Sequence, residues 1–210
     1  MKDIVIVGAG GFGREVLWLI EQINKNTLEW NFLGFIDDGK DIHEKINGYP
    51  VLGKMDWLLD KSIYVVFAIG DPLVKKSLVE KLKNTGNKYP VLIHPSINMS
   101  KTNQIEEGTI ICEGSILTVN IRIGKHVIIN LDTTMGHDVV IEDYCTILPS
   151  VNVSGNVHLK ENVMIGTGSQ IIQNIEVGHN SIIGAGSVVN KSIDANVVAV
   201  GVPARVIKTR

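Results

Sequence analysis

A period of six residues runs through the C-terminal half of the chain, and it restricts the possible folds more than any other feature of the sequence. Every sixth residue from Ile105 to Val189 is aliphatic, over fifteen successive positions without an insertion. Four residues after each of them a small or β-branched residue recurs, and glycine often follows the aliphatic residue. This period fits neither the 3.6-residue repeat of a helix nor the alternation of a simple sheet.

The repeat predicts a parallel β-helix. Each hexad is then a short strand plus a corner, with the aliphatic side chain inside and the small residue beneath the bend. Three hexads close a triangular coil of 18 residues, and successive coils stack at strand spacing, about 4.8 Å. Fifteen hexads give five coils. The period alone does not fix the handedness, so a right-handed β-solenoid is the alternative.

The aromatic residues indicate a second packing scheme in the N-terminal half. Ten of the eleven lie at or before Tyr89, and only Tyr144 follows. We therefore expect two domains, residues 1–97 and 98–210, with Pro90 and Pro95 at the join.

The first domain shows alternating strand and helix patterns. Apolar runs at 3–7, 32–36 and 64–69 predict strands, and the spacing of apolar residues at 14–24 predicts a helix. A second helix is expected from Pro72 to Leu82, because proline favours the first helical position. This order predicts an α/β half-Rossmann domain with a parallel sheet.

Composition excludes several classes of protein. The formal net charge is −2, which does not favour nucleic-acid binding, and no run of 18 apolar residues could span a membrane. Two cysteines are too few for a disulfide scaffold or a cysteine-rich zinc site, and they predict a cytoplasmic location. We expect no metal site.

Residues 8–13 form a G-x-G-x-x-G turn between the first strand and the first helix. Such a turn lets a phosphate approach the backbone, and the helix N-terminus offers free N–H groups. Fewer than a hundred residues precede the coils, so one nucleotide, or a nucleotide-activated group, fits better than NAD. The alternative is a turn kept for close packing of strand and helix.

Carboxylates and a glycine stand at the same expected edge of the sheet. Asp37 and Asp38 end the second strand, and Gly70 and Asp71 end the third. Ligands bind at this edge in open α/β sheets, and a carboxylate there could accept hydrogen bonds from a ribose or a base. A solvated loop is the alternative.

His137 is the histidine best placed for chemistry. Asp138 follows it and could orient the ring, and Gly155 lies 18 residues later, one coil away. A base beside an exposed N–H donor is the minimum set for acyl transfer. His43 is expected in a polar loop and His94 at the join. His126, His158 and His179 are expected at solvated corners of the coils. Cys145 is expected to be buried and inert, which favours direct transfer from a thioester.

Together these motifs resemble the hexapeptide-repeat transferases, in particular bacterial sugar acyltransferases of the sialic acid O-acetyltransferase and UDP-4-amino-sugar N-acetyltransferase type. The resemblance covers nearly the whole chain and implies a left-handed β-helix. The segments that carry it are 5–15, 34–38, 68–71, 92–95, 136–138, 154–157 and 201–204.

The resemblance implies roles for individual residues of the coils. His137 would be the general base, Asp138 would raise its basicity, and the Gly155 N–H would bind the thioester carbonyl oxygen. Thr167 and Ala185 would contact acetyl-CoA. The family often has a second histidine at the position of Thr146, where it contacts the acetyl donor; here a hydroxyl would make that contact, without a charge.

The resemblance also implies the partners. Gly10, Gly11 and Phe12 would meet a nucleotide-sugar together with Asp37 and Asp38, with Gly70 beside them. The protein would be a homotrimer with active sites between neighbouring coils.

The predicted function is acetyl-CoA-dependent N-acetylation of a nucleotide-linked amino sugar in bacterial surface glycan synthesis. The alternatives are a sialic acid type O-acetyltransferase, a non-catalytic nucleotide-sugar-binding scaffold and, from the glycine turn alone, an NAD-dependent oxidoreductase.

Overall fold

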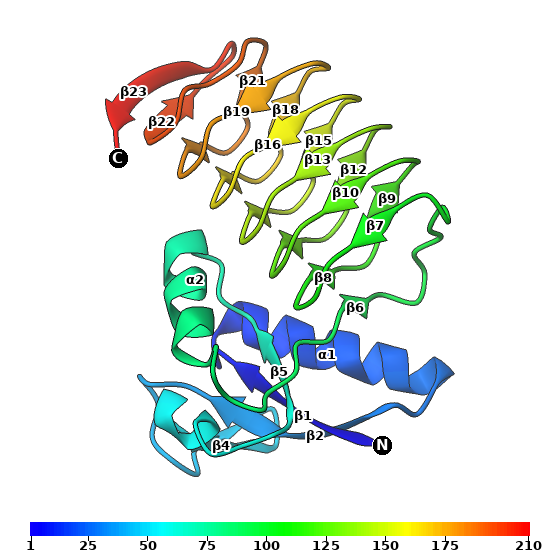
Figure 1. Cartoon of the computed structure of the whole chain (residues 1–210), viewed down its shortest axis with the longest axis vertical. Coiled ribbons are helices and arrows are strands. Elements are labelled where there is room, and N and C mark those ends of the chain that lie inside the picture. Colours follow the sequence, from blue (N-terminus) through cyan, green and yellow to red (C-terminus); the bar gives the residue numbers. More distant parts are fainter.

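The computed structural model describes residues 1–210 (Figure 1). The N-terminal part is a five-stranded sheet of order β3-β4-β2-β1-β5. All neighbouring strands are parallel except β3 and β4, which pair antiparallel. The strands are β1 (Lys2–Val7), β2 (Trp30–Ile36), β3 (Lys45–Ile46), β4 (Tyr49–Gly53) and β5 (Tyr64–Phe67).

Two helices and a short 3₁₀ segment accompany this sheet: α1 (Gly11–Asn26), η1 (Met55–Leu58) and α2 (Pro72–Lys81). The start of α2 at Pro72 confirms the prediction, and the Asp71 carboxylate caps it by accepting from the N–H groups of Leu73 and Val74 at 2.9 and 3.0 Å. In contrast, α1 begins three residues before the predicted 14–24, because the last residues of the G-x-G-x-x-G segment are already helical. Neither helix is long and apolar enough to cross a bilayer.

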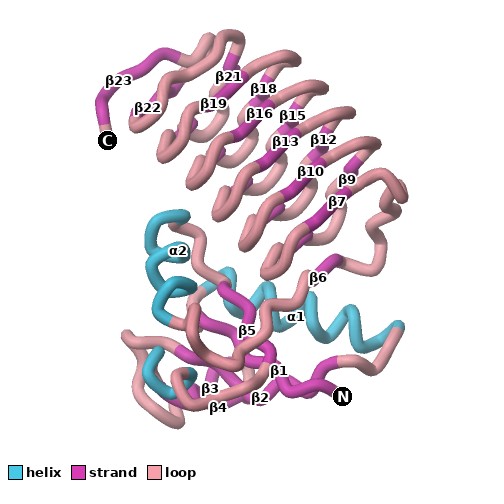
Figure 2. The backbone as a smooth tube through the Cα atoms, in the orientation of Figure 1, coloured by secondary structure: helices cyan, strands magenta, loops and turns pink.

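The C-terminal part is the predicted left-handed parallel β-helix (Figure 2). Its strands pair at a register of 18 residues, as in Arg122↔Val140 and Met135↔Val153. The strands of the five coils are β7 (Gln104–Ile105), β8 (Ile110–Ile111), β9 (Ile116–Leu117), β10 (Arg122–Ile123), β11 (Ile128–Ile129), β12 (Thr134–Met135), β13 (Val140–Ile141), β14 (Thr146–Ile147), β15 (Asn152–Val153), β16 (His158–Leu159), β17 (Met164–Ile165), β18 (Gln170–Ile171), β19 (Glu176–Val177), β20 (Ile182–Ile183) and β21 (Val188–Val189).

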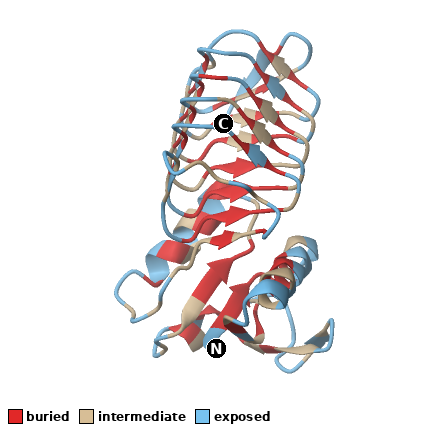
Figure 3. Cartoon of the chain, turned by 90° about the vertical axis from the view of Figure 1, so that its right-hand side faces the viewer, coloured by how far each residue is buried: buried red, intermediate tan, exposed pale blue.

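These strands form the three sides of the prism. Two sides are five-stranded sheets, of order β19-β16-β13-β10-β7 and β21-β18-β15-β12-β9. The third side gains β6 (Leu92–Ile93) at one end, and β22 (Val197–Val200) and β23 (Arg205–Thr209) at the other. Side chains of the inward aliphatic and small positions fill the interior as a core of 24 buried residues. Figure 3 shows where buried residues lie along the backbone of the coils.

The corners have a second periodicity. In fourteen successive hexads, from Gly108 to Gly186, the third residue after the aliphatic one has a positive φ. Glycine, asparagine and aspartate occupy most of these positions, because they tolerate the left-handed conformation best. Asp138 is one of them, with φ 60°. The corner conformation therefore fixes the direction in which His137 and Asp138 leave the coil.

The two parts share a hydrophobic core at the join. Leu92 on β6 and Ile110 on β8 belong to the same buried cluster as the apolar face of α1. On α2, the Lys75 ammonium is fully buried and donates to the Cys145 carbonyl at 3.3 Å and to Thr146 Oγ1 at 3.0 Å. Figure 1 shows α2 standing beside the coils on this side.

The expectation that His126 is a solvated corner is wrong. The residue is 3% exposed, and its ring stacks on Tyr144 at 5.6 Å between centroids, with Phe67 and Tyr89 edge-on. Burial lowers the pKa of His126 to about 4, so the ring is neutral. The N-terminal part covers this corner, which a repeat analysis of the coils alone could not reveal.

The two sides of the prism that the N-terminal part leaves uncovered differ in charge. We call the β7–β10–β13–β16–β19 side the charged face; its outward residues are Gln104, Glu106, Arg122, Gly124, Val140, Glu142, His158, Lys160, Glu176 and Gly178. We call the β9–β12–β15–β18–β21 side the uncharged face; its outward residues are Ile116, Thr118, Thr134, Gly136, Asn152, Ser154, Gln170, Ile172, Val188 and Asn190. His137 stands at the corner between these two faces.

Candidate active site

His137 and Asp138 form a hydrogen-bonded pair at the corner that follows β12. The His137 Nδ1 atom lies 2.7 Å from Asp138 Oδ2. Hydrogen bonds from His137 and from Asn120 hold the pKa of Asp138 below its usual value, so the carboxylate is ionised and can only accept. In the neutral imidazole Nδ1 therefore carries the proton, and Nε2 is left with a free lone pair.

The His137 ring lies over the backbone of Gly155 in the next coil. A Cβ atom at Gly155 would come within 2.6 Å of both Cε1 and Nε2 of the imidazole, so any side chain there would displace the ring. The coil register fixes this stacking, since the Asn156 N–H donates to the His137 carbonyl at 2.9 Å. The predicted juxtaposition of 137 and 155 is thus present in the structure.

The Gly155 N–H donates to no atom of the chain. It lies above Gly136, where a Cβ atom would approach the Gly155 nitrogen to 2.6 Å. Neither Gly136 nor Gly155 has a side chain that could cover this amide, so it stays open. A proton acceptor and an unused N–H donor therefore stand side by side, and the His137 side chain is 57% exposed and reachable from solvent.

Thr167 and Ala185 are stacked on one another at a different corner. Both are exposed, and the Gly186 N–H donates to the Thr167 carbonyl at 2.8 Å. They follow β17 and β20, at the opposite edge of the uncharged face from His137. The single chain brings them together with each other but not with the imidazole.

Thr146 lies on the third side of the prism, beneath α2. Its side chain is fully buried, and Oγ1 accepts the hydrogen bond from Lys75. The hydroxyl therefore packs at the join in this chain rather than beside His137. This contact could not be predicted from the sequence, because α2 and β14 are separated by about seventy residues along the chain.

At the N-terminal end, the glycines of the turn, together with Gly70 at the same edge of the sheet, divide into two kinds. A Cβ at Gly13 would collide with the Gly8 carbonyl, and one at Gly8 would meet Ala68 O at 2.9 Å. These two are required by packing. Gly10 and Gly70, in contrast, have nothing within 4 Å, and Gly11 faces only Arg14 Nη2 at 4.0 Å.

The first turn of α1 is therefore open to an anion. It has no side-chain cap and no acidic residue, and its N–H groups at Gly11 and Phe12 have no partner in the preceding turn. Arg14 stands beside it without an ion pair, and sequence reasoning missed it although it lies in the first helical turn.

Asp37 and Asp38 line a cleft of about 250 Å³ at the carboxyl ends of β1 and β2. Both carboxylates are already engaged by the backbone. Asp37 accepts from the N–H groups of Ala9 at 2.8 Å and Gly39 at 2.9 Å, and Asp38 accepts from Met55 N–H at 2.9 Å. In this structure, they hold the glycine turn and the start of η1 in place around the cleft.

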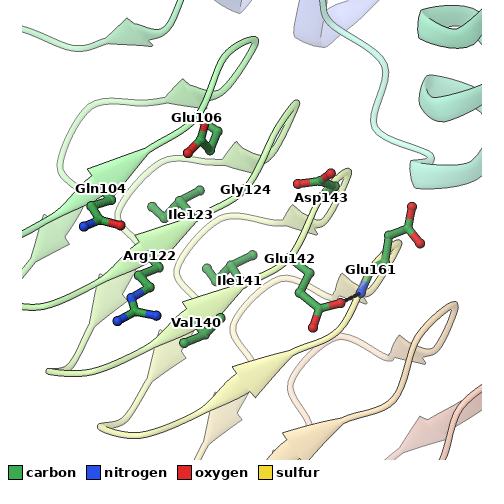
Figure 4. A pocket seen from close by; sticks show the side chains of 10 residues that line it. All are labelled: Gln104, Glu106, Arg122, Ile123, Gly124, Val140, Ile141, Glu142, Asp143 and Glu161. Carbon is green, nitrogen blue, oxygen red and sulfur yellow. Dashed lines mark hydrogen bonds between the residues drawn. The ribbon is translucent and has the colours of Figure 1, made fainter.

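Two adjoining hollows lie on the charged face. The first, of about 510 Å³, is lined by ten residues, including Arg122 and Glu161 (Figure 4). The second, of about 520 Å³, reaches the His137 corner, since Asp138 and Asn120 form part of its lining. Space for a reactant is therefore present beside the His137–Asp138 pair. No group of three or more histidine, cysteine, aspartate or glutamate side chains is arranged to hold a metal ion.

Comparison with known proteins agrees with both halves of the fold. Residues 3–82 match the family described as "PglD N-terminal domain", and residues 156–191 match "Bacterial transferase hexapeptide (six repeats)". The chain is 31% identical over 174 residues to the GDP-perosamine N-acetyltransferase of Escherichia coli O157:H7, covering 80% of this chain and 77% of that relative.

Two solved structures superpose over nearly the full length. A mutant of perosamine N-acetyltransferase from Caulobacter crescentus, in complex with CoA and GDP-perosamine, has a TM-score of 0.91 at 25% identity, with 99% of this chain and 98% of that chain covered. The acetyltransferase domain of PglB from Neisseria gonorrhoeae FA1090, in complex with acetyl coenzyme A, has a TM-score of 0.90 at 28% identity, with 98% and 99% covered.

Sequence similarity, the prism of hexad coils and the βαβ domain before it lead to the same assignment. The chain is an acyltransferase and belongs to the hexapeptide-repeat family of sugar N-acetyltransferases.

Proposed function

We propose that the protein transfers an acetyl group from acetyl-CoA to the amine of a nucleotide-linked amino sugar, in the synthesis of a bacterial surface glycan. The similarity to a GDP-perosamine N-acetyltransferase and to structures that hold CoA or acetyl coenzyme A supports the donor and the class of acceptor. The observation that carries the mechanism is the His137 imidazole lying over Gly155, beside an amide that donates to nothing else.

The chemistry follows from that pair. The acceptor amine attacks the thioester carbonyl carbon, forming a C–N bond, while His137 Nε2 takes the proton that the amine loses. The carbonyl oxygen becomes an oxyanion and accepts a hydrogen bond from Gly155 N–H; one such donor is typically worth ~10²–10³ in rate. When the C–S bond breaks, the CoA thiolate leaves and recovers a proton from the His137 imidazolium. Asp138 stabilises that imidazolium.

Cys145 takes no part in this scheme. Its side chain lies inside the coil, and burial raises the pKa of the thiol to about 12. A covalent acyl-cysteine is therefore disfavoured, and direct attack on the thioester is the simpler route.

The nucleotide is proposed to lie at the carboxyl edge of the N-terminal sheet. Backbone N–H groups at Gly10, Gly11 and Phe12 would meet its phosphates at the open start of α1. The cleft lined by Asp37 and Asp38, with Gly70 at the same edge, would take the nucleoside. Because both carboxylates already accept from backbone amides, their main contribution would be to shape this cleft.

The proposed assembly is a homotrimer in which the uncharged face meets a neighbouring chain. Ten outward residues without a charge, including Ile116 at 60% exposure, favour burial of that face. Acetyl-CoA would then lie between chains, reaching His137 of one and the Thr167–Ala185 corner of another. This would explain why one chain alone keeps those residues apart.

The experiment is thiol release from acetyl-CoA with a panel of nucleotide-linked amino sugars and their hydroxyl analogues. Acetylation of the amine that requires His137 supports the proposal. Full activity of His137→Ala would remove the proposed base, and transfer to hydroxyl analogues alone would indicate an O-acetyltransferase. Acetyl-CoA binding by His137→Ala, measured by calorimetry, checks that the variant keeps its donor site.

A further inference from the structure

A side chain from the preceding coil holds the oxygen of Asp138 that does not face His137. Asn120 lies 18 residues before Asp138, and its Nδ2 donates to Asp138 Oδ1 at 3.1 Å, while Oδ2 lies 2.7 Å from His137 Nδ1. Both residues occupy the left-handed corner position, with φ 59° and 60°. Their side chains therefore leave the same corner, one above the other.

Asn120 is itself anchored one coil further down. Its N–H donates to Thr102 Oγ1 at 2.9 Å, and that hydroxyl lies 2.9 Å from Ser100 Oγ. The series Thr102, Asn120, Asp138 and His137 thus joins three successive coils through hydrogen bonds. Thr102, Asn120 and Asp138 all line the hollow on the charged face that opens at this corner.

Asparagine side chains in successive coils are also hydrogen-bonded to one another at another corner, where no catalytic group is proposed. Asn162 donates to Asn180 at 3.0 Å, and Asn180 donates to Asn196 at 2.8 Å. Those rungs join amides, and the last amide lies 3.4 Å from His179 Nε2, with no carboxylate in the series. The rung at Asn120 differs, because its acceptor is a carboxylate whose second oxygen orients the imidazole.

We propose that Asn120 is a positioning residue for the transfer reaction, which acts by fixing the Asp138 carboxylate so that His137 presents Nε2 toward Gly155. This inference rests on the proposed role of His137 as the base. Asn120 need not touch either substrate. A carboxylate with a partner on each oxygen cannot rotate without losing a hydrogen bond, so Asn120 limits the orientations of the ring.

Two substitutions separate geometry from charge. Asn120→Ala removes the donor, and we expect kcat to fall about 10-fold while the KM for both substrates stays within about twofold. Asn120→Asp keeps the size of the side chain, and aspartate also tolerates the left-handed backbone conformation of the corner, but the change places a second carboxylate against Asp138. The added negative charge favours the protonated imidazole, so the acidic limb of the kcat/KM–pH profile is expected to move upward by about 0.5–1 pH unit.

Asn174 provides the matched control. It occupies the same corner two coils above Asp138, with φ 61°, and its side chain makes no hydrogen bond. Asn174→Ala and Asn174→Asp therefore carry the same local strain, and they are expected to leave kcat and the pH profile unchanged. Thermal unfolding of all four variants separates loss of fold from loss of orientation.

The outcomes distinguish this inference from the proposed function. If His137→Ala is inactive while both Asn120 variants keep the wild-type kcat and pH profile, the positioning role is overturned and the proposed base stands. If the Asn120 variants lose thermal stability alone, Asn120 is a structural rung and the inference is also overturned. If His137→Ala is fully active, the proposed base fails and this inference fails with it.

Discussion

The imidazole of His137 lies against the Cα of Gly155 in the next coil, and the ring fits there only because Gly155 has no side chain. The contact arises from the 18-residue register that Met135 and Val153 set within the same two coils. A repeat that serves packing thus also brings a base beside an amide. The stacking of the coils fixes the positions of the base and the amide, and no loop has to close to bring them together.

The first prediction tests this contact. Gly155→Ala places a methyl group 2.6 Å from the His137 ring and is expected to lower kcat by about 10²-fold or more, because a base displaced by an ångström loses its alignment. The Gly155 φ lies outside the left-handed region, so the fold should persist. Steady-state kinetics and circular dichroism measure the two effects. The control is Gln173→Ala, at the same corner one coil further, which should behave as wild type; an active Gly155→Ala would show that the ring position is not important.

A second prediction concerns the open start of α1. Gly11→Asp puts a carboxylate where the first turn has none, which favours the helix by about 0.3–1 kcal/mol but repels a phosphate. We expect thermal stability to be kept or raised while the affinity for the nucleotide-sugar falls at least about 10-fold, by calorimetry.

Gly13→Ala is the contrasting variant. Its methyl group would collide with the Gly8 carbonyl, so we expect lower thermal stability rather than a selective loss of binding. Undiminished binding of the nucleotide-sugar by Gly11→Asp would mean that the whole turn serves packing.

The parts of the structure that the sequence predicted are those with local or strictly periodic causes. The hexad period predicted the inward residues, the coil length and the stacking of His137 on Gly155. The start of α2 followed from Pro72. Each of these depends on residues close together in the chain or related by a fixed number of residues.

What the sequence did not predict depends on the docking of the two halves. His126 was expected in solvent and is buried against Phe67, and Thr146 was expected beside acetyl-CoA and accepts from Lys75. Hexad positions that point outward look alike in sequence, whether solvent or the N-terminal part covers them. Asn120 was missed for another reason: its signal is the pairing of two corner residues, which appears only once the positive φ at every sixth position is known.

A third prediction concerns the uncharged face. Ile116→Glu introduces a charge on β9, at one end of a face whose ten outward residues carry none, and in the proposed trimer that charge would be desolvated. We expect the trimer measured by light scattering for the wild type to dissociate and activity to be lost with it. Leu28→Glu, at an exposed apolar residue of the N-terminal part, should change neither. A wild-type monomer, or a stable trimer of Ile116→Glu, would contradict the proposed interface.

The last prediction is a pH dependence of stability caused by Lys75. Burial lowers its pKa to about 7 in the folded protein, against 10.5 for the free side chain. Between these values the unfolded chain binds more protons than the folded one, so the free energy of unfolding rises with pH from about 7. Below about pH 7, Lys75 is protonated in both the folded and the unfolded chain, so its contribution to the free energy of unfolding stays at its minimum. Each pKa unit corresponds to about 1.4 kcal/mol.

Urea unfolding between about pH 6.5 and pH 8.5 isolates this effect. Within that window His126 is neutral in both states for most of the range. The buried cysteines differ from the unfolded ones only towards its upper end, where the unfolded thiols begin to ionise, and this effect is the same in every variant compared. Lys75→Met removes the buried ammonium and two hydrogen bonds, and we expect it to abolish the slope and to stabilise the protein by roughly 1–3 kcal/mol at the lower end. Lys76→Met, which removes the partly exposed ion pair with Glu161, should retain the slope. An equal slope in Lys75→Met and wild type would show that Lys75 is protonated alike in both states, and that its charge is tolerated at the join.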